Sequence, residues 1–291
     1  MSIDVLQEKI RKLKNPVVVD MTVLPEHIPA YIREKMDPVS AYVHFCRELM
    51  KGLKGSVGAV RYSFSHLALM GSNGLTALSE LLDLARKMDY YVLLDAAEVL
   101  TPWGADRAAS AFFGEESQYP CNGLIVSPYI GSDAIKPFIP YCKDAGKDLF
   151  LAVRTPNKSA SEVQDLLTGA RHVYTATADL VSRYGDPILG KSGYSRIAAL
   201  SSAGNPSVLA EMRGKYKRMF LLVDGLDYPS GNAKNCSYAF DRMGHGAAVC
   251  AGPAITAAWY SAETDGTDYV EQAVQAVERI RKNLSRYFAI V

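Results

Sequence analysis

Short apolar runs alternate with longer segments of helical periodicity along the chain after residue 15. Each short run is rich in aliphatic or aromatic residues and ends at a polar residue or a turn, as expected of strands covered on both faces. The segments between them have the apolar spacing of amphipathic helices. The predicted strands are 16–21, 57–63, 91–95, 123–127, 149–154, 196–200, 220–224 and 247–251.

This order of elements predicts the fold class. Eight strands that alternate with helices over 291 residues are typical of an α/β protein, a (β/α)8 TIM barrel. We expect a single barrel domain over 1–291, with an N-terminal helix at about 1–14 and a C-terminal helix at about 267–289. No linker rich in Pro, Gly or Ser divides the chain. An open doubly wound sheet with extra strands is the alternative.

Charged side chains stand at or near the carboxyl ends of the predicted strands, namely Asp20, Arg61, Asp95, Arg154 and Asp224. In α/β folds this end of the strands is where ligands bind. Asp95 directly follows a buried strand, so it is either a site residue or a cap of the next turn. Together the charges could form a polar substrate pocket or a salt-bridge network that closes the barrel mouth.

Composition argues against several classes of partner. There are 32 Lys and Arg residues against 31 Asp and Glu, a net charge of +1, so no overall field attracts nucleic acid or an anionic membrane. No apolar run approaches the roughly 20 residues of a membrane span, and the N-terminus lacks the core of a signal peptide. We therefore expect a cytoplasmic protein that binds neither nucleic acid nor membrane.

The cysteine and histidine spacing does not indicate a metal site. The five cysteines are widely and irregularly spaced, which fits neither a disulfide framework nor a zinc site. We interpret them as reduced residues, mostly in the core, with a catalytic thiol as the alternative. The five histidines lack metal-ligand spacing, and His66 alone follows a strand end closely enough to reach the rim. A P-loop and a GxGxxG motif are both absent from the sequence.

Four segments, in order along the chain, carry a resemblance to a known family. They are 71–75 (GSNGL), similar to GxEGL; 127–133 (SPYIGSD), similar to NPYLGxD; 153–157 (VRTPN), similar to VRTSNP; and 190–195 (GKSGYS), similar to GxxGYS. The chain thereby resembles orotidine 5'-monophosphate decarboxylase in its longer bacterial form over nearly its whole length. The resemblance implies a (β/α)8 barrel, a homodimer, a lyase of pyrimidine biosynthesis, a pocket at the strand ends, and no metal or organic cofactor.

The charged signature of that family, DxKxxD with a lysine at the end of the preceding strand, is degenerate here. A gapless alignment keeps Asp95 but places Ala97 at the signature lysine and Leu100 at the second aspartate, and the preceding lysine falls at Arg61. In the family the signature lysine supplies both a compensating charge and the proton that quenches the product carbanion. Ala97 can do neither, and Arg61 is a poor proton donor because it stays protonated.

Binding positions are partly kept. Asp20 matches a ribose-hydroxyl partner of the family, and the other candidates for substrate binding are Thr155 in the VRTPN segment, Glu98 in the signature segment and His66.

The phosphate-binding positions are altered. Pro253 stands where the family has its phosphate-binding arginine, while Asp224 and Asp227 add negative charge nearby. Proline offers neither charge nor an N–H donor, so we expect poor binding of a phosphate monoester.

Two classes of function follow. The first is a non-catalytic or diverged homologue that binds a small polar ligand, with a nucleotide-like molecule as one candidate. Its homodimer interface lies on the strand-end face, with Leu100 in or beside it. The second is an enzyme, either an active orotidine 5'-monophosphate decarboxylase or another carbon–carbon lyase. In that case Asp95 and Arg61 are the catalytic candidates, assisted by Asp20 and Glu98.

Overall fold

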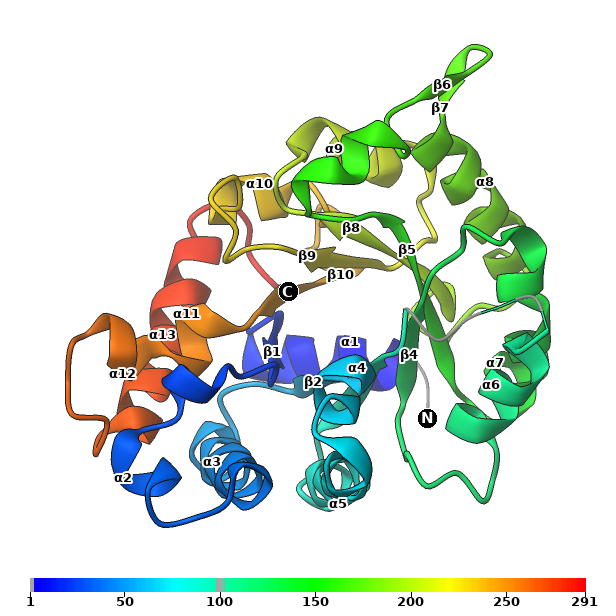
Figure 1. The fold of residues 1–291 in the computed structure, drawn as a ribbon. Coiled ribbons are helices and arrows are strands. Elements are labelled where there is room, and N and C mark those ends of the chain that lie inside the picture. The colour runs from blue at the N-terminus through cyan, green and yellow to red at the C-terminus, as the bar shows by residue number, and fades with distance from the viewer. Residues whose placement is uncertain (1–2, 98–100, 102) are drawn as a thin grey trace.

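The computed structural model describes residues 3–97, 101 and 103–291 (Figure 1). Glu98 and Leu100 lie outside the described residues. Over the described residues, eight parallel strands close into a barrel in the order β1-β10-β9-β8-β5-β4-β3-β2, which confirms the predicted (β/α)8 fold and excludes the open sheet. The barrel strands are β1 (Val17–Asp20), β2 (Ala59–Ser63), β3 (Tyr91–Asp95), β4 (Gly123–Val126), β5 (Asp148–Arg154), β8 (Ile197–Ser202), β9 (Leu221–Asp224) and β10 (Ala247–Ala251).

Helices surround the barrel, as Figure 1 shows. The longer ones are α1 (Ile3–Leu13), α3 (Pro38–Leu53), α5 (Gly71–Lys87), α6 (Ala105–Phe113), α8 (Val173–Gly185), α9 (Pro206–Lys215) and α13 (Tyr269–Leu284). The shorter ones are α2 (Ala30–Arg33), α4 (Phe64–Ala68), α7 (Ile139–Asp144), α10 (Ala233–Ser237), α11 (Pro253–Thr256) and α12 (Ala258–Ser261), and the 3-10 turns are η1 (Pro25–His27), η2 (Gly131–Ala134), η3 (Lys136–Phe138) and η4 (Lys158–Glu162).

The C-terminal helix is shorter than the sequence predicts. It ends at Leu284 rather than near residue 289, because the chain then turns back onto the barrel. Phe288 stacks on Phe240 with ring centroids 3.9 Å apart, and the Val291 N–H donates to the Met243 carbonyl oxygen. Packing of the last residues therefore replaces further helical turns.

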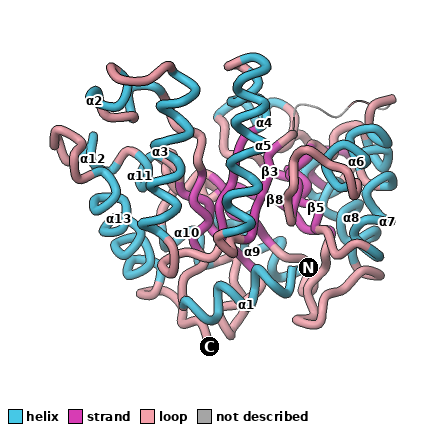
Figure 2. Tube along the Cα trace, turned by 90° about the horizontal axis from the view of Figure 1, so that it is seen from below, coloured by secondary structure: helices cyan, strands magenta, loops and turns pink. Residues whose placement is uncertain are grey.

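Alternate residues of each strand point into the barrel, and this alternation fixes where the charged side chains lie. The interior is filled by an apolar cluster that includes Tyr91, Phe150 and Phe220, and residues of α1 pack into the same cluster. Figure 2 shows α1 at one end of the barrel and α2 and α4 at the opposite end. The amino ends of the strands are thus covered by α1, whereas the polar interior positions fall at the carboxyl ends.

The cysteines confirm the core interpretation. All five are free and buried. Burial raises the pKa of the Cys250 thiol well above its ordinary value, even though the nearby Arg61 opposes this shift. The thiol is therefore held in its unreactive, protonated form. Within the described residues, no helix combines the length and apolar character needed to cross a membrane.

A buried carboxyl group ties α1 to the bottom of the barrel. Asp148, at the start of β5, is fully buried; it accepts a hydrogen bond from the Ile3 N–H at 2.8 Å and another from the Tyr91 hydroxyl. Burial raises the pKa of Asp148 to about 7, although these two donors and Arg196 oppose the shift. The carboxyl group is therefore protonated in the folded protein at mildly acidic pH.

This raised pKa predicts a pH-dependent stability. The contribution of Asp148 is complete below the ordinary pKa of 3.8 and is lost as the pH rises through about 7, because the folded state holds the proton more tightly. We expect thermal or urea unfolding at pH 5 and pH 8 to show that Asp148→Asn reduces the pH-dependent loss of stability by on the order of 2 kcal/mol. Asp144→Asn, an exposed change of the same charge, is the control. An unchanged pH dependence in Asp148→Asn would contradict this assignment.

Candidate active site

One guanidinium and three carboxylates meet at the carboxyl ends of β1, β2, β3 and β9, and we call Asp20, Arg61, Asp95 and Asp224 the rim cluster. Arg61 Nη1 lies 3.4 Å from Asp20 Oδ2 and 3.2 Å from Asp224 Oδ2, while Arg61 Nη2 donates to Asp95 Oδ2. All four residues occupy interior-facing positions, in line with Val18, Ala59, Leu93 and Leu222 of the interior cluster. The salt-bridge network that the sequence allowed is therefore present.

The rim cluster is not electrically balanced. Arg61 is only 9% exposed, and burial opposes its charge, but Asp224, Asp20 and Asp95 together raise its pKa well above the ordinary value. The guanidinium therefore stays protonated. Three carboxylates still face one positive charge, so the site carries an excess of negative charge whenever all three are ionised.

Asp95 also serves the turn that follows it. Its Oδ1 accepts the Ala97 N–H at 3.1 Å, so the capping role and the site role are combined in one carboxylate. Ala97 lies in this turn and brings only a methyl group where the resemblance calls for a lysine.

His66 lies beside the rim cluster. It stands on α4, with its ring 5.5 Å from the ring of Tyr42. Burial lowers the pKa of His66, while the charge of Asp20 and a backbone contact with Val23 oppose the shift. The ring is therefore neutral at pH 7. Its Nε2 is buried and has no hydrogen-bond partner among the described residues.

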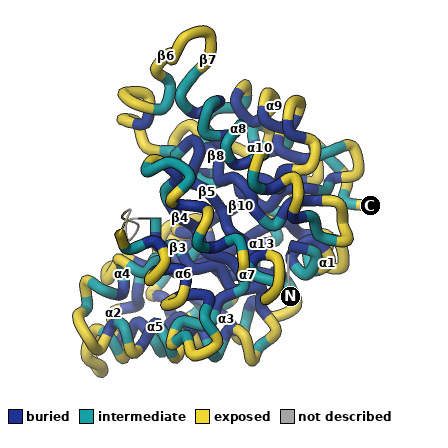
Figure 3. The backbone as a smooth tube through the Cα atoms, turned by 90° about the vertical axis from the view of Figure 1, so that its right-hand side faces the viewer, coloured by how far each residue is buried: buried dark blue, intermediate teal, exposed yellow. Residues whose placement is uncertain are grey.

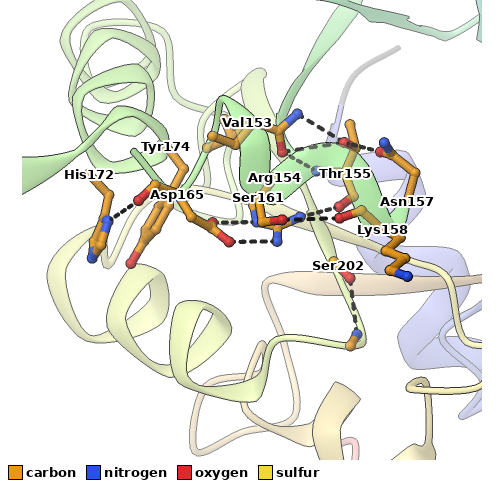
Figure 4. Close-up of polar contacts among 12 residues, drawn as sticks. Val153, Arg154, Thr155, Asn157, Lys158, Ser161, Asp165, His172, Tyr174 and Ser202 are labelled. Atoms are coloured by element: carbon orange, nitrogen blue, oxygen red, sulfur yellow. Dashed lines mark hydrogen bonds and ion pairs between the residues drawn. The ribbon is translucent and has the colours of Figure 1, made fainter. Parts of the chain in front are cut away.

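The segment after β5 is held by its own polar contacts (Figure 4). Arg154 makes a two-pronged ion pair with Asp165, at 2.8 Å and 2.9 Å, and donates to the Thr155 carbonyl oxygen. The Thr155 hydroxyl contacts Asn157 at 2.6 Å and accepts from Gln164 Nε2 at 2.9 Å. Thr155, predicted to bind substrate, is therefore engaged within its own loop, and the charge of Arg154 is neutralised by Asp165.

Beyond these contacts the chain forms a hairpin, β6 (Leu167–Thr168) and β7 (Arg171–His172). It projects from the barrel next to α8, and Figure 3 shows the tip of the hairpin as exposed. Leu167 on this hairpin is 68% exposed.

The loop between β9 and α10 lies across the strand ends. A Cβ added at Gly225 would come within 2.6 Å of Pro156, which follows β5, and one added at Gly204, which follows β8, would come within 2.4 Å of Ser230. Glycine at these two positions lets the loop approach its neighbours closely. The loop therefore bridges the connections after β5 and β8.

Asp227 in the same loop reaches the end of β10. Its Oδ2 accepts the Gly252 N–H, and the Ala254 N–H is close enough to the carboxylate to lower its pKa. Partial burial and the charges of Asp20 and Asp224 raise the pKa of Asp227, while the two N–H donors lower it. Pro253, which the sequence resemblance aligns with the family's phosphate-binding arginine, is the first residue of α11.

The structure brings together most of the predicted site residues. Asp20, Arg61 and Asp95 are in contact, His66 lies next to Asp20, and Thr155 is turned into its own loop. Glu98 and Leu100 lie outside the described residues. Sequence reasoning missed Asp165 and Gln164, because they lie in an irregular segment where no periodicity or motif signals a partner. Within the described residues, no three His, Cys, Asp or Glu side chains are arranged to hold a metal ion.

The barrel and its strand-end site define a class of proteins, the (β/α)8 barrels with a polar centre at the carboxyl ends of the strands. No protein family model matches the chain. Among curated proteins, the orotidine 5'-phosphate decarboxylase of Clostridium kluyveri is 27% identical over 286 residues, covering 98% of this chain and 97% of that protein. The protein of the same name from Rhodopirellula baltica is 29% identical over 232 residues, covering 78% and 77% respectively.

Solved structures show the same fold. The chain is similar to the orotidine monophosphate decarboxylase of Leishmania donovani with a TM-score of 0.73 and 22% identity, covering 97% of this chain and 100% of the other. The corresponding Plasmodium berghei enzyme gives a TM-score of 0.74 at 13% identity, covering 97% and 99%. The chain is thus similar over nearly its whole length to proteins named orotidine 5'-phosphate decarboxylase.

Proposed function

We propose that this protein is a non-catalytic or diverged member of the orotidine 5'-phosphate decarboxylase family, which does not decarboxylate orotidine 5'-monophosphate but binds a small polar ligand at its strand ends. The supporting observation is the rim cluster, where Arg61, at the position of a family lysine, is held by Asp20, Asp95 and Asp224. Decarboxylation leaves a carbanion that must be stabilised and protonated. Arg61 does not release a proton at any working pH, and Ala97 has none to give.

We expect the purified protein to show no turnover of orotidine 5'-monophosphate above background. Loss of a positioned proton donor alone costs on the order of 10² to 10⁴-fold in rate. The assay follows decarboxylation by untagged protein from a host without its own decarboxylase, beside a family enzyme with an intact DxKxxD as a positive control. Robust turnover, or growth of a uracil auxotroph that depends on this chain, would show that the proposal is wrong.

We also propose that two copies associate through the strand-end face. Exposed apolar side chains follow the carboxyl ends of several strands: Leu69 after β2, Trp103 after β3, Tyr129 after β4, Leu167 after β5 and Tyr228 after β9. Trp103 is 95% exposed and Leu69 is 87% exposed. All connections of this kind leave the barrel at the same end, and exposed apolar groups gathered at one end are typical of an interaction surface.

The dimer predicts a specific sensitivity to charge. We expect light scattering to give a dimer at micromolar concentration and Trp103→Glu to weaken it by about 2 kcal/mol or more, as for a buried interface tryptophan. Tyr287→Glu, an equally drastic change at an exposed position beyond α13, is the control. A monomeric wild-type protein would refute the dimer, whereas equal effects of Trp103→Glu and Tyr287→Glu would refute the assigned face.

We propose that the protein is located in the cytoplasm and consists of a single barrel domain. We also propose that it needs no metal or organic cofactor and does not bind nucleic acid. The near-zero net charge supports the last point, because nucleic-acid binding depends on an excess of basic residues.

A further inference from the structure

The end of the barrel near β9 and β10 is where a phosphate group would be expected to bind. In many (β/α)8 barrels the loops after the seventh and eighth strands, with the start of a short extra helix, form a phosphate site from backbone N–H groups. Here β9 and β10 are the seventh and eighth barrel strands in chain order, and the short helix α11 follows β10. A phosphate group could bind here only through N–H groups that have no partner within the protein.

The N–H groups at the start of α11 lie beside a carboxylate or bond back within the helix. The Gly252 N–H donates to Asp227 Oδ2, and the Ala254 N–H is close enough to the same carboxylate to lower its pKa. Pro253 has no N–H, and the Ile255 N–H donates back to the Gly252 carbonyl oxygen at 2.8 Å. A ligand phosphate would therefore have to displace Asp227 before it could be bound by the backbone.

The charges around this position also disfavour the binding of a phosphate group. Asp20 and Asp224 are close enough to Asp227 to raise its pKa, so a phosphate here would meet three carboxylates. The guanidinium of Arg61 is engaged by Asp20, Asp95 and Asp224. An unpaired like charge at a binding site is a strong means of rejecting one ligand while accepting a related one.

We infer that Asp227 is a specificity-determining residue: its carboxylate occupies the N–H groups of Gly252 and Ala254 and excludes phosphorylated ligands from the strand-end site. A carboxylate tethered in the same molecule competes at a high effective concentration with any free anion. The ligand of this barrel is then a polar molecule without a phosphate group. The inference rests on the proposed function, since it assumes that the ligand occupies the strand-end site.

Calorimetric titration with inorganic phosphate and uridine monophosphate tests this inference. We expect no measurable binding of either by the wild-type protein, and an affinity for uridine monophosphate at least about tenfold higher in Asp227→Gly, which frees both N–H groups. Asp227→Asn removes the charge but keeps an oxygen on the N–H groups, so its gain should be smaller. Asp224→Asn removes the same charge while Asp227 stays in place, and it should gain less than Asp227→Gly.

Three results would overturn the inference. One is micromolar binding of uridine monophosphate by the wild-type protein, a measurement that does not depend on the folding of any variant. Another is a folded Asp227→Gly protein, with a cooperative thermal transition, whose affinity equals that of the wild type. The third is an equal gain in Asp224→Asn, which would assign the effect to net charge. If the wild-type protein does not decarboxylate orotidine 5'-monophosphate and one of these three results is found, only this inference is wrong. Decarboxylation by the wild-type protein would instead refute the proposed function.

Discussion

Replacement of Arg61 by methionine is expected to lower the free energy of unfolding by roughly 3 to 5 kcal/mol, the range for removal of one partner from a buried ion pair. The side chain is 9% exposed and faces Asp20, Asp95 and Asp224. Methionine fills a similar volume but leaves three carboxylates to repel one another in a partly buried site. Urea unfolding at pH 7 measures the loss.

Two comparisons separate this electrostatic cause from a packing defect. Arg61→Lys keeps the positive charge but not the planar fork, so it should be less destabilising than Arg61→Met. Removal of a facing carboxylate should relieve the repulsion, so Arg61→Met should cost less in an Asp95→Asn background than in the wild type. A loss that is the same in both backgrounds would show that packing, not charge, explains the effect.

The barrel could be predicted from the sequence because its strands are buried on both faces. A strand such as Tyr91–Asp95 is a continuous apolar run that ends at a charged residue. This pattern can be recognised in the sequence without knowing which strands lie beside it. The same logic located the residues of the rim cluster, since a polar residue at an interior position is tolerated only where the strand leaves the core.

The partners of these residues could not be predicted, because they depend on strand register and on loop paths. The pairing of Asp20 with Arg61 follows from the parallel register of β1 and β2, which the sequence does not specify. Asp165 binds Arg154 across a loop of irregular structure, and Asp227 reaches Gly252 on a different strand connection. Sequence alone indicated negative charge near a phosphate site, but not that this charge occupies the backbone donors.

Restoring the family signature alone is expected to leave the protein inactive. The double variant Ala97→Lys with Leu100→Asp returns the proton donor and the second carboxylate. A positioned proton donor alone contributes on the order of 10² to 10⁴-fold in rate. We expect no turnover of orotidine 5'-monophosphate above background, because a bound phosphate normally contributes binding energy that lowers the chemical barrier. In this chain Asp227 accepts the Gly252 N–H, a donor that we infer is thereby denied to a phosphate group.

The decisive comparison adds the phosphate positions to the same background. Asp227→Gly and Pro253→Arg, with the 224–231 loop rebuilt to a family sequence, should give measurable decarboxylation together with binding of uridine monophosphate. A matched protein with Ala97→Met in place of Ala97→Lys has a side chain of comparable length but no amine, so it should bind the nucleotide without turning over substrate. A protein that cannot hold the phosphate has no means of placing the substrate carboxylate against the new lysine. Activity of the double variant without the phosphate-position changes would therefore show that phosphate binding is intact and that the altered signature is the whole defect.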